Sequence, residues 1–331
     1  MSISKYHHLV PQTYLSTWAN NSGTLQIMDV KTGSETTRNK ENFCGVNHYH
    51  SIIAGMPFCT KADTDKIFAS LSVYAVKYQG VTLTDSLDMN RLFGAFDEWE
   101  ICRPDGSPVR KKMLKHEILQ VKIQDIEEMW SSNYENKWPD VRSHIEREVL
   151  SGLSKVPSFE FDYLMEIFTA MDWRSASSNA LFDEMFNNLS NKGLNLDEII
   201  FDEDEKDLPF FNTAADYIKH CILLDYYRQF LCKRGVIYKH SEANKLNTSF
   251  CFLVANGKTR FITSDNPAFL AERTDAMKVG IMPITPEILM VQGKNSSSDK
   301  NYYISHIDDE QVEEYNKVIE NNALEFIVKP Q

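Results

Sequence analysis

The residues best suited to chemistry stand at the start of the chain, where His8 and Gln12 flank Leu9-Val10-Pro11. A proline fits the first turn of a helix because its φ is fixed and it has no N–H to leave unpaired, so we expect a helix to begin at Pro11. His8 then lies just before this helix and Gln12 in its first turn, near the positive end of the helix dipole. An imidazole in this position tends to stay neutral, able to accept a proton or bind a metal ion.

A second candidate is Asp265, which follows the hydrophobic stretch Phe261-Ile262-Thr263 together with Ser264 and Asn266. Polar residues at the end of a strand are placed where binding sites often form, so Asp265 is a candidate catalytic carboxylate and Ser264 and Asn266 candidate binding residues. The structural alternative is that Asp265 or Asn266 caps a short helix that starts at Pro267 and covers residues 268–272.

Arg174 is the third candidate, because it follows an apolar helical segment and the aromatic Trp173. A guanidinium group can bind a phosphate or a carboxylate through two parallel hydrogen bonds. The alternative is an ion pair with an acidic neighbour such as Asp265. His48 and His50 form a fourth pattern, since a strand over residues 47–53 places them on one face, either as metal ligands or as an exposed polar face.

These residues must be positioned by a fold of the α+β class. Residues 25–30 and 34–38 flank the turn-like Lys31-Thr32-Gly33 and predict a hairpin. Residues 61–235 have mainly helical spacing, including 113–130, 159–171 and 214–233. The chain after Lys245 predicts a hairpin (249–255 and 258–263) around Asn256-Gly257, strands at 279–284 and 288–291, a helix at 308–322 and a strand at 324–328.

The arrangement predicts one mixed or antiparallel sheet, built from the N-terminal hairpin and the C-terminal strands, with a large helical region between them in sequence. The helix at Pro11 should then lie near the C-terminal strands, with Tyr14, Leu15 and Trp18 facing the core. We expect a single domain over residues 1–331, made of an opening helix and hairpin (1–60), a helical region (61–245) and a β-rich region (246–331).

Composition limits the function. The chain has 331 residues, of which 42% are hydrophobic, and a formal net charge of -12, which opposes non-specific binding to nucleic acid or anionic membrane. Its six cysteines form no C-x-x-C pair. No apolar run reaches the roughly 18 residues of a membrane span. We therefore expect a cytoplasmic protein without a membrane partner.

The chain resembles the domain of unknown function 4238 family, and the likeness runs nearly end to end. The motifs that carry it are His8-Leu9-Val10-Pro11-Gln12-Thr13-Tyr14-Leu15, Asn42-Phe43-Cys44, residues 168–175, residues 261–267 and Met282-Pro283-Ile284-Thr285-Pro286. The family often has a proline two residues after the arginine and a further arginine beyond it, where this chain has Ala176 and Asn179. The resemblance implies that these residues recur together, but it implies no activity.

The leading hypothesis is a nuclease or related phosphoesterase, a hydrolase that could act as a bacterial toxin or an antiviral (phage-defence) effector on nucleic acid or nucleotides. In it His8 is the general acid or base, Asp265 orients it or binds a divalent ion such as Mg²⁺ or Mn²⁺, and Gln12 and Arg174 hold the phosphate.

Two alternatives remain open. In the first, the protein is a non-enzymatic binding or regulatory module, and His8, Gln12, Arg174 and Asp265 form a buried network that ties the opening helix to the sheet. In the second, it is an NAD-cleaving or ADP-ribosyl-transferring enzyme whose arginine binds the pyrophosphate, although no Gly-rich phosphate loop is present.

Overall fold

The computed structural model describes residues 5–175, 183–184, 187–188, 196–201, 208, 210–272, 278–294 and 301–331. The chain divides into two compact units. Unit 1 comprises Met1–Lys5, His48–Met129 and Phe186–Cys232, and unit 2 comprises Tyr6–Asn47, Trp130–Met185 and Lys233–Gln331. The single-domain organisation expected from the sequence stays a prediction. The α+β class is confirmed, with helices and with antiparallel and mixed sheets.

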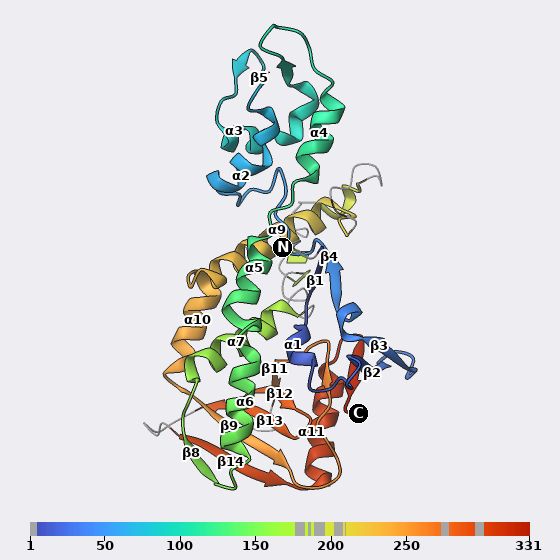
Figure 1. The fold of residues 1–331 in the computed structure, drawn as a ribbon, viewed down its shortest axis with the longest axis vertical. Helices are drawn as coiled ribbons and strands as arrows, with labels where there is room; N and C mark the ends of the chain where they lie inside the picture. Colours follow the sequence, from blue (N-terminus) through green and yellow to red (C-terminus); the bar gives the residue numbers. More distant parts are fainter. Residues whose placement is uncertain are drawn as a thin grey trace. The chain divides into compact units, whose positions relative to one another are not determined.

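Unit 2 contains a six-stranded mixed sheet (Figure 1) with the strand order β11-β12-β13-β9-β14-β8. Its strands are β8 (Lys155–Pro157), β9 (Thr248–Ala255), β11 (Phe269–Glu272), β12 (Lys278–Thr285), β13 (Ile288–Lys294) and β14 (Asn301–Ile307). Adjacent strands are antiparallel, except that β9 and β14 run parallel.

Apolar residues of this sheet pack against α11 (Asp309–Asn322). Leu253, Ile281 and Leu289 of the sheet belong to one buried cluster with Val312 and Ile319 of the helix. Val312 and Ile319 are two helical turns apart, so both project from the same face. One hydrophobic core of unit 2 therefore lies between this sheet and α11.

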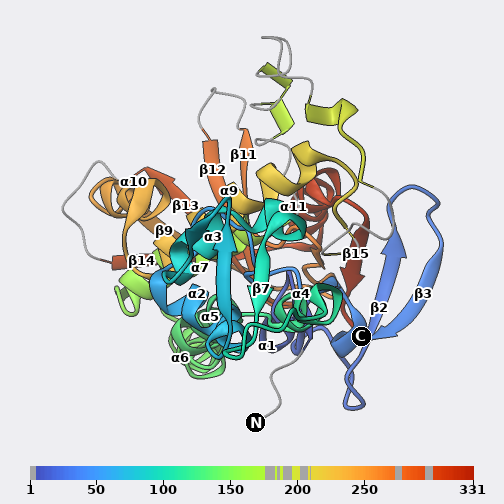
Figure 2. The ribbon, with the colours of Figure 1, turned by 90° about the horizontal axis from the view of Figure 1, so that it is seen from above.

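A four-stranded antiparallel sheet joins the two ends of the chain within unit 2, in the order β10-β15-β2-β3. Its strands are β2 (Thr24–Asp29), β3 (Glu35–Asn39), β10 (Thr263–Ser264) and β15 (Phe326–Lys329). Figure 2 shows the blue β2–β3 hairpin beside the red strand β15. The N-terminal hairpin therefore shares a sheet with the C-terminal strands β10 and β15, as predicted. The prediction of one sheet is wrong, because the other C-terminal strands form the separate six-stranded sheet.

The opening segment contains β1 (Tyr6–His8), which pairs with β4 (Gly45–Asn47), and the short helix α1 (Gln12–Leu15). The helix begins one residue later than predicted. Pro11 has an extended ψ of 136° and serves as the N-cap residue. Its carbonyl oxygen accepts hydrogen bonds from the backbone N–H groups of Tyr14 and Leu15, both at 3.1 Å.

Two aromatic side chains attach this segment to the C-terminal strands, as predicted. The Tyr14 hydroxyl donates to the carbonyl oxygen of Pro283 over 2.8 Å and lies 2.8 Å from Thr263 Oγ1. The indole N–H of Trp18 donates to the carbonyl oxygen of Phe261 over 3.1 Å. Both rings are buried.

Three longer helices complete the described part of unit 2: α6 (Trp138–Val149), α7 (Phe161–Arg174) and α10 (Gly235–Lys245). Unit 1 has a three-stranded antiparallel sheet in the order β6-β5-β7, made of β5 (Ala75–Tyr78), β6 (Val81–Thr82) and β7 (Glu100–Cys102). Its helices are α2 (Lys61–Ile67), α3 (Ser86–Arg91), α4 (Lys111–Gln120), α5 (Asp125–Trp130, whose last residue belongs to unit 2) and α9 (Ala214–Leu231).

Hydrogen bonds from one arginine side chain connect three helices of unit 1. The Arg228 guanidinium on α9 donates to both carboxylate oxygens of Asp63 on α2, over 2.6 and 3.0 Å, and also to Asp125 on α5. Asp63 in turn completes a capping box with Thr60. Across the described part of the chain, none of the helices combines the length and the apolar composition that crossing a bilayer requires.

The predicted hairpin around Asn256-Gly257 is wrong. Both edges of β9 are taken, by β13 and β14, so the chain leaves the sheet after Ala255. The glycine at position 257 is explained by a close contact instead of a hairpin turn. A Cβ atom on Gly257 would lie 2.0 Å from Asp309 Oδ1. The glycine allows this carboxylate to approach the backbone and accept a hydrogen bond from the N–H of Thr259 over 2.7 Å.

Three other local predictions are corrected. Residues 269–272 form strand β11 rather than a helix, with Phe269 and Ala271 buried and Leu270 and Glu272 exposed, which is the period of a strand. The strand predicted at 47–53 ends at Asn47 because His48 adopts a left-handed backbone with φ of 60°. The helix predicted at 113–130 is interrupted between α4 and α5, where residues 52 and 123 form an isolated β-bridge.

Candidate functional site

His8 is held by contacts to both of its ring nitrogens. Nδ1 lies 3.3 Å from the carbonyl oxygen of Phe43, which can only accept, so Nδ1 carries the proton. Nε2 is then the acceptor for the side-chain amide of Gln12, 2.6 Å away. The Tyr6 ring meets the imidazole edge-on, with 5.0 Å between ring centroids. This arrangement fits a neutral imidazole, as the sequence predicts.

Asp265 follows β10, and its carboxylate accepts hydrogen bonds from the backbone of residues 324–326. Oδ1 accepts a hydrogen bond from the N–H of Leu324 over 2.9 Å, while Oδ2 accepts from Glu325 and Phe326 over 2.7 and 3.1 Å. The side chain therefore caps no helix at Pro267, and that alternative is wrong. Burial raises the pKa of Asp265 above its ordinary value, although the three N–H groups act in the opposite direction.

Ser264 and Asn266 also make contacts within the fold. Ser264 Oγ donates to the carbonyl oxygen of Asn266 and accepts from its N–H, over 3.0 and 3.1 Å. The Asn266 amide donates to the carbonyl oxygen of Asn322 over 3.0 Å, and its Oδ1 accepts from Ser175 over 3.0 Å. These bonds join the ends of β10, α7 and α11.

Arg174, the last residue of α7, is 2% exposed. Its guanidinium forms an ion pair with Glu135 and lies 5.0 Å from the centre of the Trp130 ring. The ion-pair interpretation made from the sequence therefore holds, with Glu135 in place of the suggested Asp265. The pair was not predictable from sequence spacing, because 39 residues separate its members.

The structure distributes the six candidates among four places in unit 2. Arg174 lines a small cavity together with Pro11, Thr13 and Tyr14. Asp265 lines a separate pocket of about 350 Å³. His8 and Gln12 line neither of these cavities, and Ser264 and Asn266 lie in the contact described above. The catalytic and binding roles assigned to these residues stay predictions.

The 350 Å³ pocket, called the Arg38 pocket below, gathers segments that are distant in sequence. It is lined by Tyr6, Leu9, Arg38, Asn42, Cys44, Gly45, Val46, Asp265, Leu324, Glu325 and Phe326. Three of the segments that carry the family resemblance contribute to this lining, at Leu9, at Asn42 and Cys44, and at Asp265. The pocket therefore lies where these segments converge.

Arg38 is the functional candidate that sequence reasoning missed. Its guanidinium carbon lies 4.8 Å from the centre of the Phe326 ring, and in the described part of the chain it forms no ion pair with an acid. The sequence placed Arg38 in a hairpin strand, but only the pairing of β2 with β15 brings it to Phe326. No local signal could have revealed this.

Cys44 and Gly45 shape the same pocket. Burial raises the pKa of the Cys44 thiol well above its ordinary value, and the charges of Asp265 and Glu325 add to this, so the thiol stays protonated. A Cβ atom on Gly45 would lie 2.3 Å from Cε1 of Tyr6. The glycine therefore lets the Tyr6 ring form a wall of the pocket, where its hydroxyl accepts from the N–H of Gly45 over 3.1 Å.

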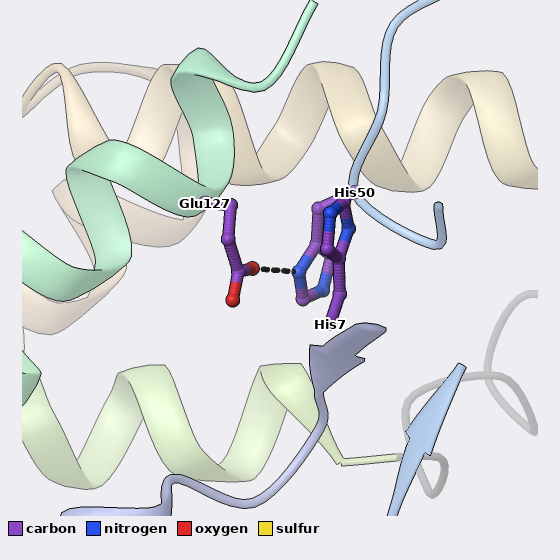
Figure 3. A group of neighbouring side chains, drawn as sticks. All are labelled: His7, His50 and Glu127. Carbon is purple, nitrogen blue, oxygen red and sulfur yellow. Dashed lines mark hydrogen bonds and ion pairs between the residues drawn. The ribbon is translucent and has the colours of Figure 1, made fainter. Parts of the chain in front are cut away.

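Unit 1 contains a histidine–carboxylate pair that the sequence did not predict. Figure 3 shows Glu127 facing His50, with 2.6 Å between Oε2 and Nδ1. The Tyr49 ring contacts the imidazoles of both His50 and His220, at centroid distances of 5.4 and 4.8 Å. Burial, followed by the proximity of His50, lowers the pKa of His220 to about 3. The Glu127 carboxylate accepts a hydrogen bond from Nδ1–H of His50, which fixes the orientation of the imidazole.

Fold and contacts together describe an α+β protein whose recurring motifs join the opening segment to a mixed sheet and border the Arg38 pocket. The chain belongs to the family described as "Protein of unknown function (DUF4238)", whose sequence model matches residues 6–330. This confirms the resemblance inferred from the motifs. Neither the curated proteins nor the solved structures include a match to the chain.

Proposed function

We propose that the protein binds a small phosphorylated molecule, of the size of a nucleotide, in the Arg38 pocket. The observation that carries the proposal is the position of Arg38, whose guanidinium stacks on Phe326 at a pocket of about 350 Å³. Stacking restricts the guanidinium plane without using its N–H donors. Those donors match the oxygens of a phosphate group, which they bind in pairs.

The pocket suits a small ligand better than a nucleic acid. Its volume falls at the lower end of the range of about 300–1,000 Å³ typical of small-molecule sites. Leu9, Val46 and Phe326 supply apolar surface, which a ring of the ligand can cover. The formal net charge of -12 opposes binding to a polyanion. A nucleotide therefore remains the preferred partner among those expected from the sequence.

Two carboxylates in the pocket determine which chemical groups of the ligand, apart from its phosphate, can lie beside them. Asp265 and Glu325 line the same pocket as Arg38. Carboxylates repel a phosphate but accept hydrogen bonds from hydroxyl and amino groups. The ligand that fits best therefore has its phosphate at Arg38 and its hydroxyl or amino groups at the carboxylates, as a nucleoside monophosphate does.

Hydrolysis of such a ligand is a further step, in which His8 would act as the general acid or base. His8 does not line the Arg38 pocket, and its Nε2 accepts from Gln12. The nuclease and phosphoesterase activities, and a role in antiviral defence, therefore stay predictions. Binding without chemistry agrees with the alternative of a binding or regulatory module.

Calorimetric titration tests the binding proposal, with AMP, adenosine and inorganic phosphate as ligands. We expect AMP to bind more tightly than adenosine, and Arg38→Ala to weaken AMP binding at least about tenfold, since each tenfold change corresponds to about 1.4 kcal/mol. Arg38→Lys keeps the charge but loses the paired donors, so it should restore only part of the affinity.

Lys31→Ala is the matched control, because Lys31 is an exposed cation in the turn of the same hairpin and does not line the pocket. It changes the net charge as Arg38→Ala does, and AMP affinity should stay at the wild-type value. Equal AMP affinities for wild type and Arg38→Ala, or no binding of AMP to the wild type, contradict the proposal.

A further inference from the structure

The two carboxylates of the Arg38 pocket differ in how much of their hydrogen-bonding capacity the fold uses. Asp265 accepts hydrogen bonds from the backbone N–H groups of residues 324–326, and these occupy most of the roughly four acceptor sites of a carboxylate. The side chain of Glu325 is exposed, and within the part of the chain that the structure describes it forms no ion pair and no hydrogen bond. Glu325 is therefore the carboxylate that is available to a ligand.

The backbone of Glu325 is held on both sides by hydrogen bonds. Its N–H donates to Asp265 Oδ2 over 2.7 Å, and its carbonyl oxygen accepts from the N–H of Val30 over 2.8 Å. The next residue is Phe326, whose ring centre lies 4.8 Å from the guanidinium carbon of Arg38. The Glu325 side chain therefore starts from a fixed position beside the proposed phosphate anchor.

The thiol of Cys44 shows that the Glu325 carboxylate lies on the pocket side of the chain. Burial is the largest cause that raises the pKa of Cys44; the charges of Asp265 and Glu325 raise this pKa further, and the charge of Arg38 lowers it. Because electrostatic interactions weaken with distance, Glu325 and Arg38 both lie near Cys44, which lines the pocket. A cation and an available carboxylate therefore lie near the same residue of the pocket wall.

We propose that Glu325 selects a ribonucleotide over the corresponding deoxyribonucleotide, by accepting hydrogen bonds from the 2′- and 3′-hydroxyl groups of the ribose. This role of Glu325 rests on the proposed function, in which the phosphate binds at Arg38. The two oxygens of a carboxylate can accept from two neighbouring hydroxyls, and an acidic side chain binds the ribose of dinucleotides through such a bond. In a nucleoside 5′-monophosphate these hydroxyls lie across the sugar ring from the phosphate, so the phosphate charge is kept away from Glu325.

Calorimetric titration of the full chain with AMP and 2′-deoxy-AMP tests this role. The wild type should bind AMP about tenfold more tightly, because 2′-deoxy-AMP lacks one hydrogen bond to the carboxylate. Glu325→Ala should remove most of this preference, because it weakens AMP binding more than 2′-deoxy-AMP binding. Glu325→Gln retains one acceptor oxygen, so its preference should lie between those of the wild type and Glu325→Ala.

Glu313→Ala is the matched control, because it removes the same charge from an exposed side chain that does not line the pocket. Its preference for AMP should equal that of the wild type. The variant Arg38→Ala separates the two ways of failing. Equal binding of AMP and 2′-deoxy-AMP by the wild type, or an unchanged preference in Glu325→Ala, overturns the role of Glu325; if Arg38→Ala still weakens the binding of both nucleotides, the proposed function stands. If neither nucleotide binds the wild type, the proposed function and the role of Glu325 are both overturned.

Discussion

The carboxylate of Asp265 accepts a hydrogen bond from the backbone N–H of Glu325, with 2.7 Å between Oδ2 and the nitrogen. The N–H groups of Leu324 and Phe326 donate to the same carboxylate. These three residues lead from the end of α11 into β15, the strand that pairs with β10 just before Asp265. One side chain therefore fixes how the C-terminal strand enters the sheet.

Asp265→Asn should lower the free energy of unfolding by about 2–3 kcal/mol. The substitution replaces an acceptor oxygen by an NH₂ group that faces backbone donors, which leaves at least one buried N–H unpaired. Urea unfolding at pH 7 measures the loss. Glu325→Gln is the control, because it removes the same charge from an exposed side chain of the same pocket. Equal stability of Asp265→Asn and the control contradicts this role of the carboxylate.

The contrast between Tyr14 and Asp265 explains how much of the structure the sequence could predict. Tyr14 and Trp18 face the core because helical spacing fixes their side, and that spacing is visible in a few consecutive residues. The helix predicted at 308–322 was found in the same way, and its N-cap is Asp308, whose carboxylate accepts from the N–H of Gln311 over 3.0 Å. For Asp265 the local sequence suggested a catalytic carboxylate or, as the alternative shared with Asn266, a helix cap. Its carboxylate oxygens in fact accept hydrogen bonds from residues 59–61 positions away.

The contacts of the candidate site were also not predictable, because they join residues that are far apart in the sequence. Strand pairing brings Arg38 to Phe326, and tertiary packing brings Arg174 to Glu135 and His50 to Glu127. None of these pairs has a characteristic spacing, so no local pattern could indicate them. The motifs did identify the segments that converge on the Arg38 pocket, although not the guanidinium that we propose as its anchor.

Arg174→Met should destabilise the protein by about 3–5 kcal/mol, because it leaves the Glu135 carboxylate partly buried without its counter-charge. Combining it with Glu135→Gln should recover a large part of this loss, since the second substitution removes the uncompensated charge. Chemical denaturation of the two single variants and the double variant measures the coupling. Arg147→Met is the control, because Arg147 forms an exposed ion pair with Glu148 and should lose less than about 1 kcal/mol. Additive losses at Arg174 and Glu135 contradict the pairing.

Asp172 should make stability depend on pH. Burial raises the pKa of its carboxyl group to about 6, above the ordinary value near 4. Between these values the folded chain keeps a proton that the unfolded chain has released, so stability falls as the pH rises from about 4 to 6 and stays lower above.

Asp172→Asn does not titrate, so it should be more stable than wild type by about 2–3 kcal/mol at pH 7, because each pKa unit corresponds to about 1.4 kcal/mol. At pH 4 most of this advantage should disappear. Urea unfolding at both pH values makes the comparison, with the exposed Glu313→Gln as the control that should show no such change. An advantage that is the same at both pH values contradicts the assignment to the carboxyl proton.

The hydrolase hypothesis can be tested by substitution of His8. If the imidazole is the general acid or base, His8→Ala should lower turnover by about 10²–10⁴-fold. RNA, DNA and nucleotides are incubated with wild type and variant, with and without Mg²⁺ or Mn²⁺, and the products are separated by chromatography. His306→Ala, at an exposed histidine of β14, is the control.

Gln12→Ala should shift the pH profile of any turnover, because the Gln12 amide donates to His8 Nε2 over 2.6 Å. If the Gln12 amide has only a structural role, the substitution should lower stability and leave the pH profile unchanged. Identical products and rates from wild type and His8→Ala exclude catalysis by this histidine.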